Sequence, residues 1–218
     1  MPVLPMFPLN SVVFPGQRVP LHVFEPRYRE LIRDVLDSEG EFGIALIREG
    51  PEVGGGAVPV DVGCAVRIVD ADELPDGRWE VVCEGTRRFR VVKALGENPY
   101  LRCEVTFPEA PADAQEAATR EAAEKLRAIY VDHLQLELAM QDAWQNHFPL
   151  PATAAALADL VAGRLEVPPS VKQGVLEATE VARQIEMLIK VLEVDNAQLK
   201  MRLAAHRRKR YGGLGILN

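Results

Sequence analysis

The side chains best suited to catalysis are few in this sequence and lie far apart. Its three serines are Ser11, Ser38 and Ser170, and none lies in a G-x-S-x-G motif. The four histidines occur without H-E-x-x-H or a closely spaced cysteine, which argues against a zinc site. No lysine follows a glycine, so the chain lacks the P-loop that cradles nucleotide phosphates. These residues predict a protein that is not an enzyme and uses no metal or cofactor.

Two further sets of reactive side chains have simple explanations. His22 and Glu25 are the right types for a metal ligand pair or a proton shuttle, but no second motif supports either, and chance proximity is the favoured interpretation. Cys64, Cys83 and Cys103 fall at the apolar positions of alternating runs, which predicts small buried residues without reactivity. An odd number of cysteines without C-x-x-C is typical of a reducing compartment.

The composition limits the class of protein. Hydrophobic residues make up 48% of the chain, enough for a substantial core, while no stretch approaches the roughly 20 apolar residues that cross a bilayer. The N-terminus has no secretory signal, so we expect a soluble protein in the cytoplasm. A net charge of −7 opposes general attraction to nucleic acid or anionic membranes.

The spacing of apolar residues, which predicts the elements that position these side chains, changes near residue 110. Before it, apolar residues alternate with polar ones, as in half-buried strands. Four runs show this pattern: Cys64-Val66-Ile68, Trp79-Val81-Cys83, Phe89-Val91 and Leu101-Cys103-Val105-Phe107. Asp76-Gly77 predicts a hairpin turn, and Glu84-Gly85-Thr86 a second reversal or a bulge. We therefore predict an antiparallel meander that closes into a barrel over residues 1–110.

Helical periodicity appears once in this first part and dominates the second. Residues 26–37 place Tyr28, Leu31 and Ile32 on one apolar stripe, with a proline in the first turn. Residues 111–218 predict a helical bundle with helices over 114–147, 154–162 and about 170–210. Asp113 with Glu116 marks the first helix start, and Ser170 with Gln173 forms a capping box for the last. Asn196 interrupts the heptad seam of that long helix, where a buried asparagine fixes register.

Several stretches of the chain carry a family resemblance. The sequence opens with PMFPLNSVVFPG and VPLHVFEPRYRELI, continues through FGIAL, VDVGCAVRIVDADELPDGRWEVVCEGTRRFRVV and PYLRCEV, and resumes at LADLVAGRLEVPPSVKQGVLE. Together they resemble the N-terminal domain family of Lon protease, the substrate-recognition module of that ATP-dependent protease. The resemblance implies an α+β fold, a PUA-like β pseudobarrel followed by an α-helical bundle with a long C-terminal helix.

The same resemblance implies a function. A stand-alone form of this module, without the ATPase and Ser-Lys peptidase modules, would recognise unfolded or exposed polypeptide segments and catalyse nothing. Its partners would be unfolded polypeptides or protein clients, with a protease or chaperone as a further candidate.

Candidate contact residues lie on the short helix and near it. Arg27, Glu30 and Asp34 lie on the helix face opposite the apolar stripe, which makes them the first candidates for partner contacts. Tyr28 and Trp79 are secondary candidates, because the stripe and the inward parity of a strand favour a core position for them. Tyr100 lies in a turn that could flank a site.

Two alternatives remain open. PUA-like folds include RNA readers, and the chain contains Arg87-Arg88-Arg90 and the terminal run HRRKR, although no stacking motif for RNA accompanies them. Alternatively, the heptad helix forms a homodimer or docks onto a partner, which would make the protein an interaction scaffold.

Overall fold

A computed structural model of the chain describes residues 1–96, 99–109 and 111–211. The chain forms two compact units, one of Met1–Ala110 with Ala162–Ala178 and one of Pro111–Val161 with Thr179–Asn218. The first unit thus takes in a segment that our division at residue 110 assigns to the helices. That the parts 1–110 and 111–218 act as separate domains stays a prediction.

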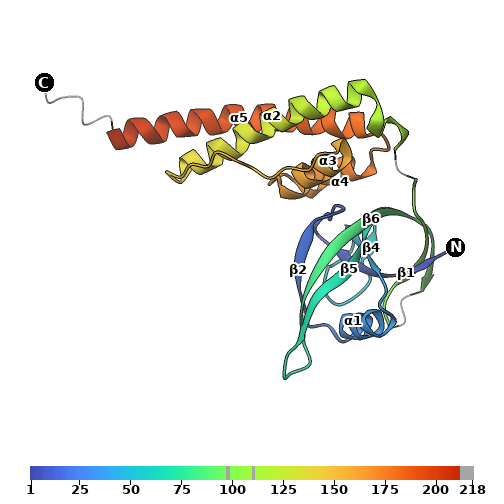
Figure 1. Cartoon of the computed structure of the whole chain (residues 1–218). Coiled ribbons are helices and arrows are strands. Elements are labelled where there is room, and N and C mark those ends of the chain that lie inside the picture. The colour runs from blue at the N-terminus through green and yellow to red at the C-terminus, as the bar shows by residue number, and fades with distance from the viewer. Residues whose placement is uncertain (97–98, 110, 212–218) are drawn as a thin grey trace, which may run out of the picture. The chain divides into compact units, whose positions relative to one another are not determined.

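The first unit is built on a sheet that closes on itself (Figure 1). Its strands in the described residues are β1 (Val3–Leu9), β2 (Arg18–Val23), β3 (Phe42–Glu49), β4 (Val58–Pro59), β5 (Val62–Glu73), β6 (Trp79–Gly96) and β7 (Arg102–Thr106). The order β1-β7-β6-β5-β3 forms a ring, because β1 pairs antiparallel with β7 and parallel with β3. The meander is confirmed for β5 to β7, whereas the parallel pair makes the sheet mixed.

The two predicted turns have different outcomes. At Asp76-Gly77 the chain reverses in a hairpin: the Leu74 carbonyl accepts from the Gly77 N–H, and φ at Gly77 is 77°. At Gly85 the chain does not reverse, because β6 runs on to Gly96. Instead the register shifts between the pairs Ala65–Arg87 and Val66–Gly85, which is a bulge.

Helix α1 (Pro26–Ser38) confirms the predicted stripe and buries Tyr28, Leu31, Ile32 and Val35. These side chains join a core cluster with barrel residues that include Cys64 and Cys83. Cys103 lies in a second cluster with Met6 and Phe89. The three cysteines are buried as predicted, and burial raises the pKa of the Cys83 thiol to about 12 and that of Cys103 to about 11.

The helical elements differ from the prediction at their ends. They are a short 3₁₀ turn (Ala112–Gln115), α2 (Ala117–Met140), α3 (Ala154–Arg164), α4 (Pro169–Glu177) and α5 (Val181–Tyr211). The predicted first helix over 114–147 is therefore too long. No described helix is long and apolar enough to cross a membrane.

The continuous helix predicted over 170–210 is wrong, because the chain is extended at Ala178, where ψ is 125°. Helix α5 begins anew with a cap from a distant residue. The Asp113 carboxylate accepts the N–H groups of Val181 at 3.1 Å and Ala182 at 2.8 Å. Asp113 thus caps α5 and not α2, which begins without a side-chain cap.

The predicted capping box at Ser170 is also wrong. The N-cap residue of α4 is Pro168, and no side chain caps it. Gln173 instead donates from its amide to the Val62 carbonyl of β5 at 3.0 Å, which holds α4 against the barrel within the first unit.

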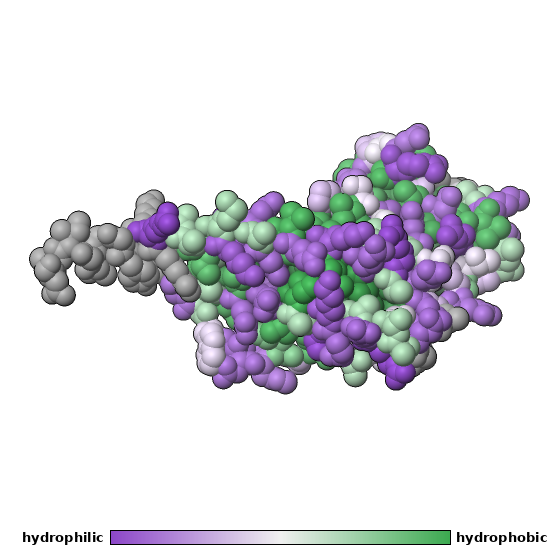
Figure 2. Space-filling model, turned by 90° about the horizontal axis from the view of Figure 1, so that it is seen from above, coloured by the Kyte–Doolittle hydropathy of each residue, from purple (hydrophilic) through white to green (hydrophobic). Residues whose placement is uncertain are grey.

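Helices α2 and α5 pack side by side in the second unit (Figure 1). Asn196 is buried in their seam as predicted. Its Nδ2 donates to the Ile129 carbonyl at 3.1 Å, and its Oδ1 lies 2.9 Å from Nδ1 of His133, which is also buried. The His133 ring therefore donates from Nδ1. Hydrophilic residues lie between the apolar ones over much of the face seen in Figure 2.

Candidate functional site

An apolar groove of about 300 Å³ runs beside β2. It is lined from β1 by Phe7 and Leu9, from β2 and the segment after it by Pro20, Leu21, His22, Val23, Phe24 and Glu25, from α1 by Tyr28, and from the β3–β4 loop by Glu52 and Val53. We call this the β2 groove. Its floor belongs to the barrel core, since Phe7, Leu21, Val23 and Tyr28 are buried there.

Two large apolar side chains lie exposed at the rim of the β2 groove. Phe24 retains 47% of its accessible surface and Val53 retains 55%. Exposed apolar groups beside a concave apolar floor are typical of a binding surface. The β2 groove can therefore receive an apolar side chain from another molecule.

The β3–β4 loop is held in place as one wall of the groove. Gly54, Gly55 and Gly56 all have positive φ, at 94°, 98° and 77°, a conformation that other residues rarely adopt. Glu25 fastens the loop, because its Oε2 accepts the Gly54 N–H at 3.0 Å. Arg27 pairs with the same carboxylate at 3.2 Å, and its guanidinium stacks on Tyr28.

The two carboxylates that line the groove have different partners. Glu25 is paired with the cation of Arg27. Glu52 accepts from the neutral side-chain amide of Asn10 at 2.8 Å and from its main-chain N–H at 3.2 Å. The lining thus has a carboxylate whose hydrogen bonds come from neutral groups, and no lysine or arginine among the described residues.

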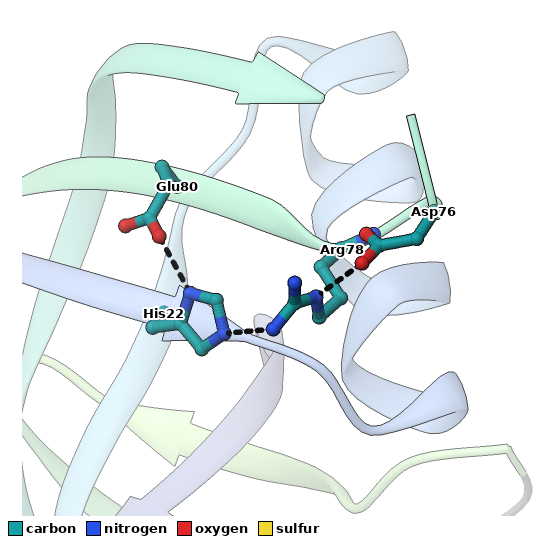
Figure 3. Close-up of polar contacts among 4 residues, drawn as sticks. All are labelled: His22, Asp76, Arg78 and Glu80. Atoms are coloured by element: carbon teal, nitrogen blue, oxygen red, sulfur yellow. Dashed lines mark hydrogen bonds and ion pairs between the residues drawn. The ribbon is translucent and has the colours of Figure 1, made fainter. Parts of the chain in front are cut away.

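A chain of polar contacts crosses from β2 to the β5–β6 hairpin (Figure 3). Nδ1 of His22 lies 2.6 Å from the Glu80 carboxylate, and Nε2 lies 3.3 Å from Nη1 of Arg78. Arg78 also binds Asp76 at 2.7 Å and, through hydrogen bonding and its charge, holds the pKa of that carboxyl below its usual value. A neutral ring that donates from Nδ1 to Glu80 and accepts at Nε2 satisfies these contacts.

The hydrogen-bonded carboxylate partner of His22 is therefore Glu80. Among the described residues, no group of three histidine, cysteine, aspartate or glutamate side chains is placed to hold a metal ion.

The six candidate contact residues separate into three places. Tyr28 forms part of the floor of the β2 groove and stacks on Phe7 with ring centroids 4.1 Å apart, and Arg27 lies outside the lining but pairs with Glu25 of the groove. Asp34 lies on another part of α1, where the hydroxyl of Tyr100, from the segment before β7, donates to its carboxylate at 2.6 Å. Burial, and then this acceptor, raise the pKa of Tyr100 to about 12. Glu30 is exposed on the same helix.

Trp79 lies apart, at the start of β6. It packs against the core cluster beneath α1, and its indole Nε1 is buried with no hydrogen-bond partner in the described part of the chain. Trp79, Glu30, Asp34 and Tyr100 are not part of the lining of the β2 groove, and their role in partner contacts stays a prediction.

A second groove of about 400 Å³ lies on another part of the barrel. It is bordered by Arg48, by the segment Ala57–Asp61, by Val91–Ala94 of β6, and by Leu101 and Cys103. Val92 is exposed there to 50%. Unlike the β2 groove, it has the cationic side chains of Arg48 and Lys93 in its lining.

Two of the arginines that suggested RNA binding, Arg87 and Arg88, have partners within the protein. Arg87 pairs with Glu41 at 2.8 Å and stacks on Phe107, and Arg88 donates to the Leu176 carbonyl at 3.2 Å. In the terminal run HRRKR, the side chains of Arg207, Lys209 and Arg210 lie outside the described part of the structure.

The exposed rim residues Phe24 and Val53 and the carboxylate of Glu52 were not among the candidates expected from the sequence. Two signals were present. Pro20 lies inside an alternating run, which marks an edge strand, and Phe24 falls on the outward parity of that run. No local signal places Val53 beside Phe24, because the two are brought together by the β3–β4 loop.

The chain is similar in sequence to known proteins over most of its length. Residues 3–194 match the family model described as the ATP-dependent protease La (LON) substrate-binding domain. Lon protease of Anaeromyxobacter dehalogenans and Lon protease 2 of Myxococcus xanthus are each 28% identical over 201 residues, or 91% of this chain. The chain spans 24% of the length of each of these relatives.

Solved structures share the fold. A Lon N-terminal domain protein from Xanthomonas campestris superposes with a TM-score of 0.65 at 29% identity, covering 87% of this chain and 98% of that one. The N-terminal domain of a Lon protease from the Mycobacterium avium complex gives a TM-score of 0.66 at 21% identity, covering 88% and 98%. These matches confirm the resemblance and the α+β fold class expected from the sequence.

Proposed function

Because the chain belongs to the family of the ATP-dependent protease La (LON) substrate-binding domain, we propose that it binds unfolded or exposed segments of other polypeptides, and that they bind in the β2 groove. The observation that carries this proposal is the position of Phe24 and Val53, two exposed apolar side chains beside an apolar floor. An unfolded chain differs from a folded one chiefly in the apolar side chains that it presents to water. A groove of this kind is selective for that difference.

The size of the β2 groove predicts a modest affinity for polypeptide segments. A volume of about 300 Å³ is at the lower end for small-molecule pockets and accepts only a few side chains. Burying one large apolar side chain contributes about 1.5–3 kcal/mol, and ordering a flexible segment offsets part of the gain. A module of this affinity captures and releases its clients, which suits a recognition step before degradation or refolding.

The proposed role is binding without catalysis, in the cytoplasm. The sequence offers no P-loop lysine or serine hydrolase motif, and its odd number of cysteines without C-x-x-C suits a reducing compartment. A separate protease or chaperone would act on the captured client. The purified protein should therefore neither hydrolyse ATP nor cleave casein, and either activity copurifying through several columns would contradict this part of the proposal.

The test of the site compares two valines on two grooves. Val53 lies in the β2 groove and Val92 in the second groove, and about half of each side chain is exposed. Fluorescence anisotropy with labelled casein measures the affinity of the parent protein and of the Val53→Ser, Val92→Ser and Phe24→Ala variants. We expect Phe24→Ala to weaken binding about tenfold, Val53→Ser to weaken it less, and Val92→Ser to leave it unchanged.

The opposite pattern, with Val92→Ser impaired and the other two variants unchanged, would place the site in the second groove. A matched titration with labelled single-stranded RNA at near-physiological salt addresses the RNA alternative. Tighter binding of RNA than of casein would replace the proposal with that alternative.

A further inference from the structure

We infer that a bound segment joins the barrel as an added strand along the open edge of β2, and that segments in which apolar residues alternate with lysine or arginine bind best. This inference rests on the proposed function and concerns the same groove. It specifies which main-chain groups hold the client and which client sequences are preferred.

The first observation is that one edge of β2 is unpaired. In the described sheet, β2 pairs with β6 from Arg18–Glu84 to Val23–Trp79 and with no other strand. It forms the left margin of the barrel in Figure 1. An unpaired strand edge presents main-chain donors and acceptors to any extended chain that reaches it.

Two independent features show which residues of β2 face this open edge. The Gly85 N–H donates to the Gln17 carbonyl at 2.9 Å, so Gln17 and alternate residues after it turn their main-chain groups toward β6. The intervening residues Arg18, Pro20 and His22 then face away. Pro20 agrees with this assignment, because proline has no N–H and is tolerated in a strand where none is needed.

The open edge therefore offers the N–H and carbonyl of Arg18, the carbonyl of Pro20, and the N–H and carbonyl of His22. These groups are spaced as an extended partner strand requires. The β2 groove lies beside this edge and has an apolar floor, so alternate side chains of an added strand can lie against Leu21 and Tyr28. Main-chain bonds supply affinity for any extended segment, and the floor selects apolar residues at alternate positions.

The negative charge of the groove lining favours basic residues at those positions of the bound segment that are not occupied by apolar residues. The groove has the carboxylates of Glu25 and Glu52 and, among the described residues, no lysine or arginine. Arg27 compensates Glu25, whereas Glu52 accepts its hydrogen bonds from the neutral main-chain N–H and side-chain amide of Asn10. A cation on the bound segment compensates Glu52, and an acidic segment would be repelled.

The experiment uses the whole chain and a fluorescein-labelled peptide of sequence Lys-Val-Lys-Phe-Lys-Val-Lys, acetylated and amidated. A series of peptides has one main-chain nitrogen methylated in each. An added strand directs alternate N–H groups toward β2, so methylation should weaken binding at least fivefold at alternate positions and leave the others within twofold. A flat profile along the peptide would overturn the inference.

Two variants of the protein, in place of changes to the peptide, test the same open edge of β2. His22→Pro removes the outward N–H, at a position with the same parity as Pro20, and His22→Ala keeps that N–H while removing the imidazole. We expect His22→Pro to weaken binding about fivefold relative to His22→Ala. Equal affinities of the two variants would contradict strand addition. If His22→Pro fails to fold by circular dichroism, the methylated peptides still decide the question on the unaltered protein.

The preference for basic segments has its own control. A peptide with glutamate in place of every lysine should bind the parent protein at least fivefold more weakly than the lysine-containing peptide does. In the Glu52→Gln variant, the difference in affinity between the two peptides should be smaller. Equal binding of both peptides would overturn this part of the inference.

Failure of the inference and failure of the proposed function give different results. If Phe24→Ala weakens binding but the methylation profile is flat, the groove binds side chains without adding a strand. If Phe24→Ala and Val53→Ser leave the affinity unchanged, the site lies elsewhere and the inference fails with it.

Discussion

Two sites in the molecule, the rim of the β2 groove and the seam between α2 and α5, depart from simple hydrophobic patterning in opposite directions. At the groove the apolar side chains of Phe24 and Val53 are exposed, whereas at the seam the polar side chains of His133 and Asn196 are buried. Each departure has a cost, because exposed apolar surface and buried polar groups are both unfavourable in isolation. Such departures occur where a surface serves binding or where a core specifies one arrangement.

The two departures differ in how they are compensated. In the helical unit the buried amide of Asn196 is bonded to His133 and to the Ile129 carbonyl, so the cost is offset within the chain. In the barrel, Phe24 and Val53 remain exposed beside the β2 groove. In the seam the buried polar groups are thus satisfied within the described part of the chain, whereas the apolar rim of the groove stays exposed to solvent, as the proposed binding of a client requires.

The largest effect should come from truncating an apolar residue that is already covered. Ile185 on α5 is fully buried, so Ile185→Ala should lower the free energy of unfolding by about 2–5 kcal/mol. Phe24→Ala removes a larger side chain but should change stability by less than about 0.5 kcal/mol, because Phe24 is exposed. Urea unfolding of both variants measures the contrast. A Phe24→Ala protein as destabilised as Ile185→Ala would show that Phe24 belongs to the core.

A smaller effect should follow from removing the buried amide of the helical seam. Asn196→Ala removes the buried acceptor of His133 Nδ1, which then has the Asp195 carboxylate at 3.6 Å, and the donor to the Ile129 carbonyl, which should cost about 1–3 kcal/mol. Val194→Ala is the matched control, since Val194 lies on the same helix and is exposed. Thermal melts measure the melting temperatures of both variants and of the parent protein. An Asn196→Ala protein with the melting temperature of the parent would mean that the seam does not depend on this network.

Smaller losses of stability than at Ile185 should come from the loop that forms one wall of the groove. Gly50 and Gly54 have nearly equal φ angles, 91° and 94°. They differ in the space around them. A Cβ added to Gly50 would lie 2.5 Å from the carbonyl oxygen of Gly56, whereas a Cβ added to Gly54 would have no atom within 4 Å. Gly54→Ala should therefore cost about 1 kcal/mol from backbone strain, and Gly50→Ala somewhat more.

The same pair of variants connects the loop to binding. Because Glu52 and Val53 lie between the two glycines, the displaced loop of Gly50→Ala should weaken peptide binding more than Gly54→Ala does. Anisotropy with the lysine-containing peptide measures this difference. Reversed or equal losses would indicate that the loop does not form a wall of the site.

Local sequence patterns predicted the elements whose determinants are close together in the chain. Pro26 and the stripe through Tyr28 and Leu31 predicted α1, and Asp76-Gly77 predicted the hairpin. The break between α4 and α5 was not predictable in this way. The apolar spacing continues through Ala178, and the carboxylate that starts α5 comes from Asp113, 68 residues before Val181.

The candidate site was less accessible to sequence reasoning for the same reason. Tyr28, a candidate on α1, lines the β2 groove, and Arg27 pairs with Glu25 of its lining, but their role in partner contacts stays a prediction. The rim and its charge depend on contacts over long sequence separations, such as Gly54 with Glu25 and Glu52 with Asn10. Periodicity shows which face of an element is apolar, but it does not show which loops meet over that face.

The measurement that tests the account most directly is a map of where a peptide binds. Amide chemical shifts of the isotope-labelled protein, followed during titration with the lysine-containing peptide, locate the contact surface residue by residue. We predict that the largest changes fall on His22, Phe24 and Val53, with small changes at Val92 and across α2 and α5. Changes confined to the second groove or to the helical unit, with the amides of the β2 groove unaffected, would contradict the central claim that the β2 groove receives the client chain.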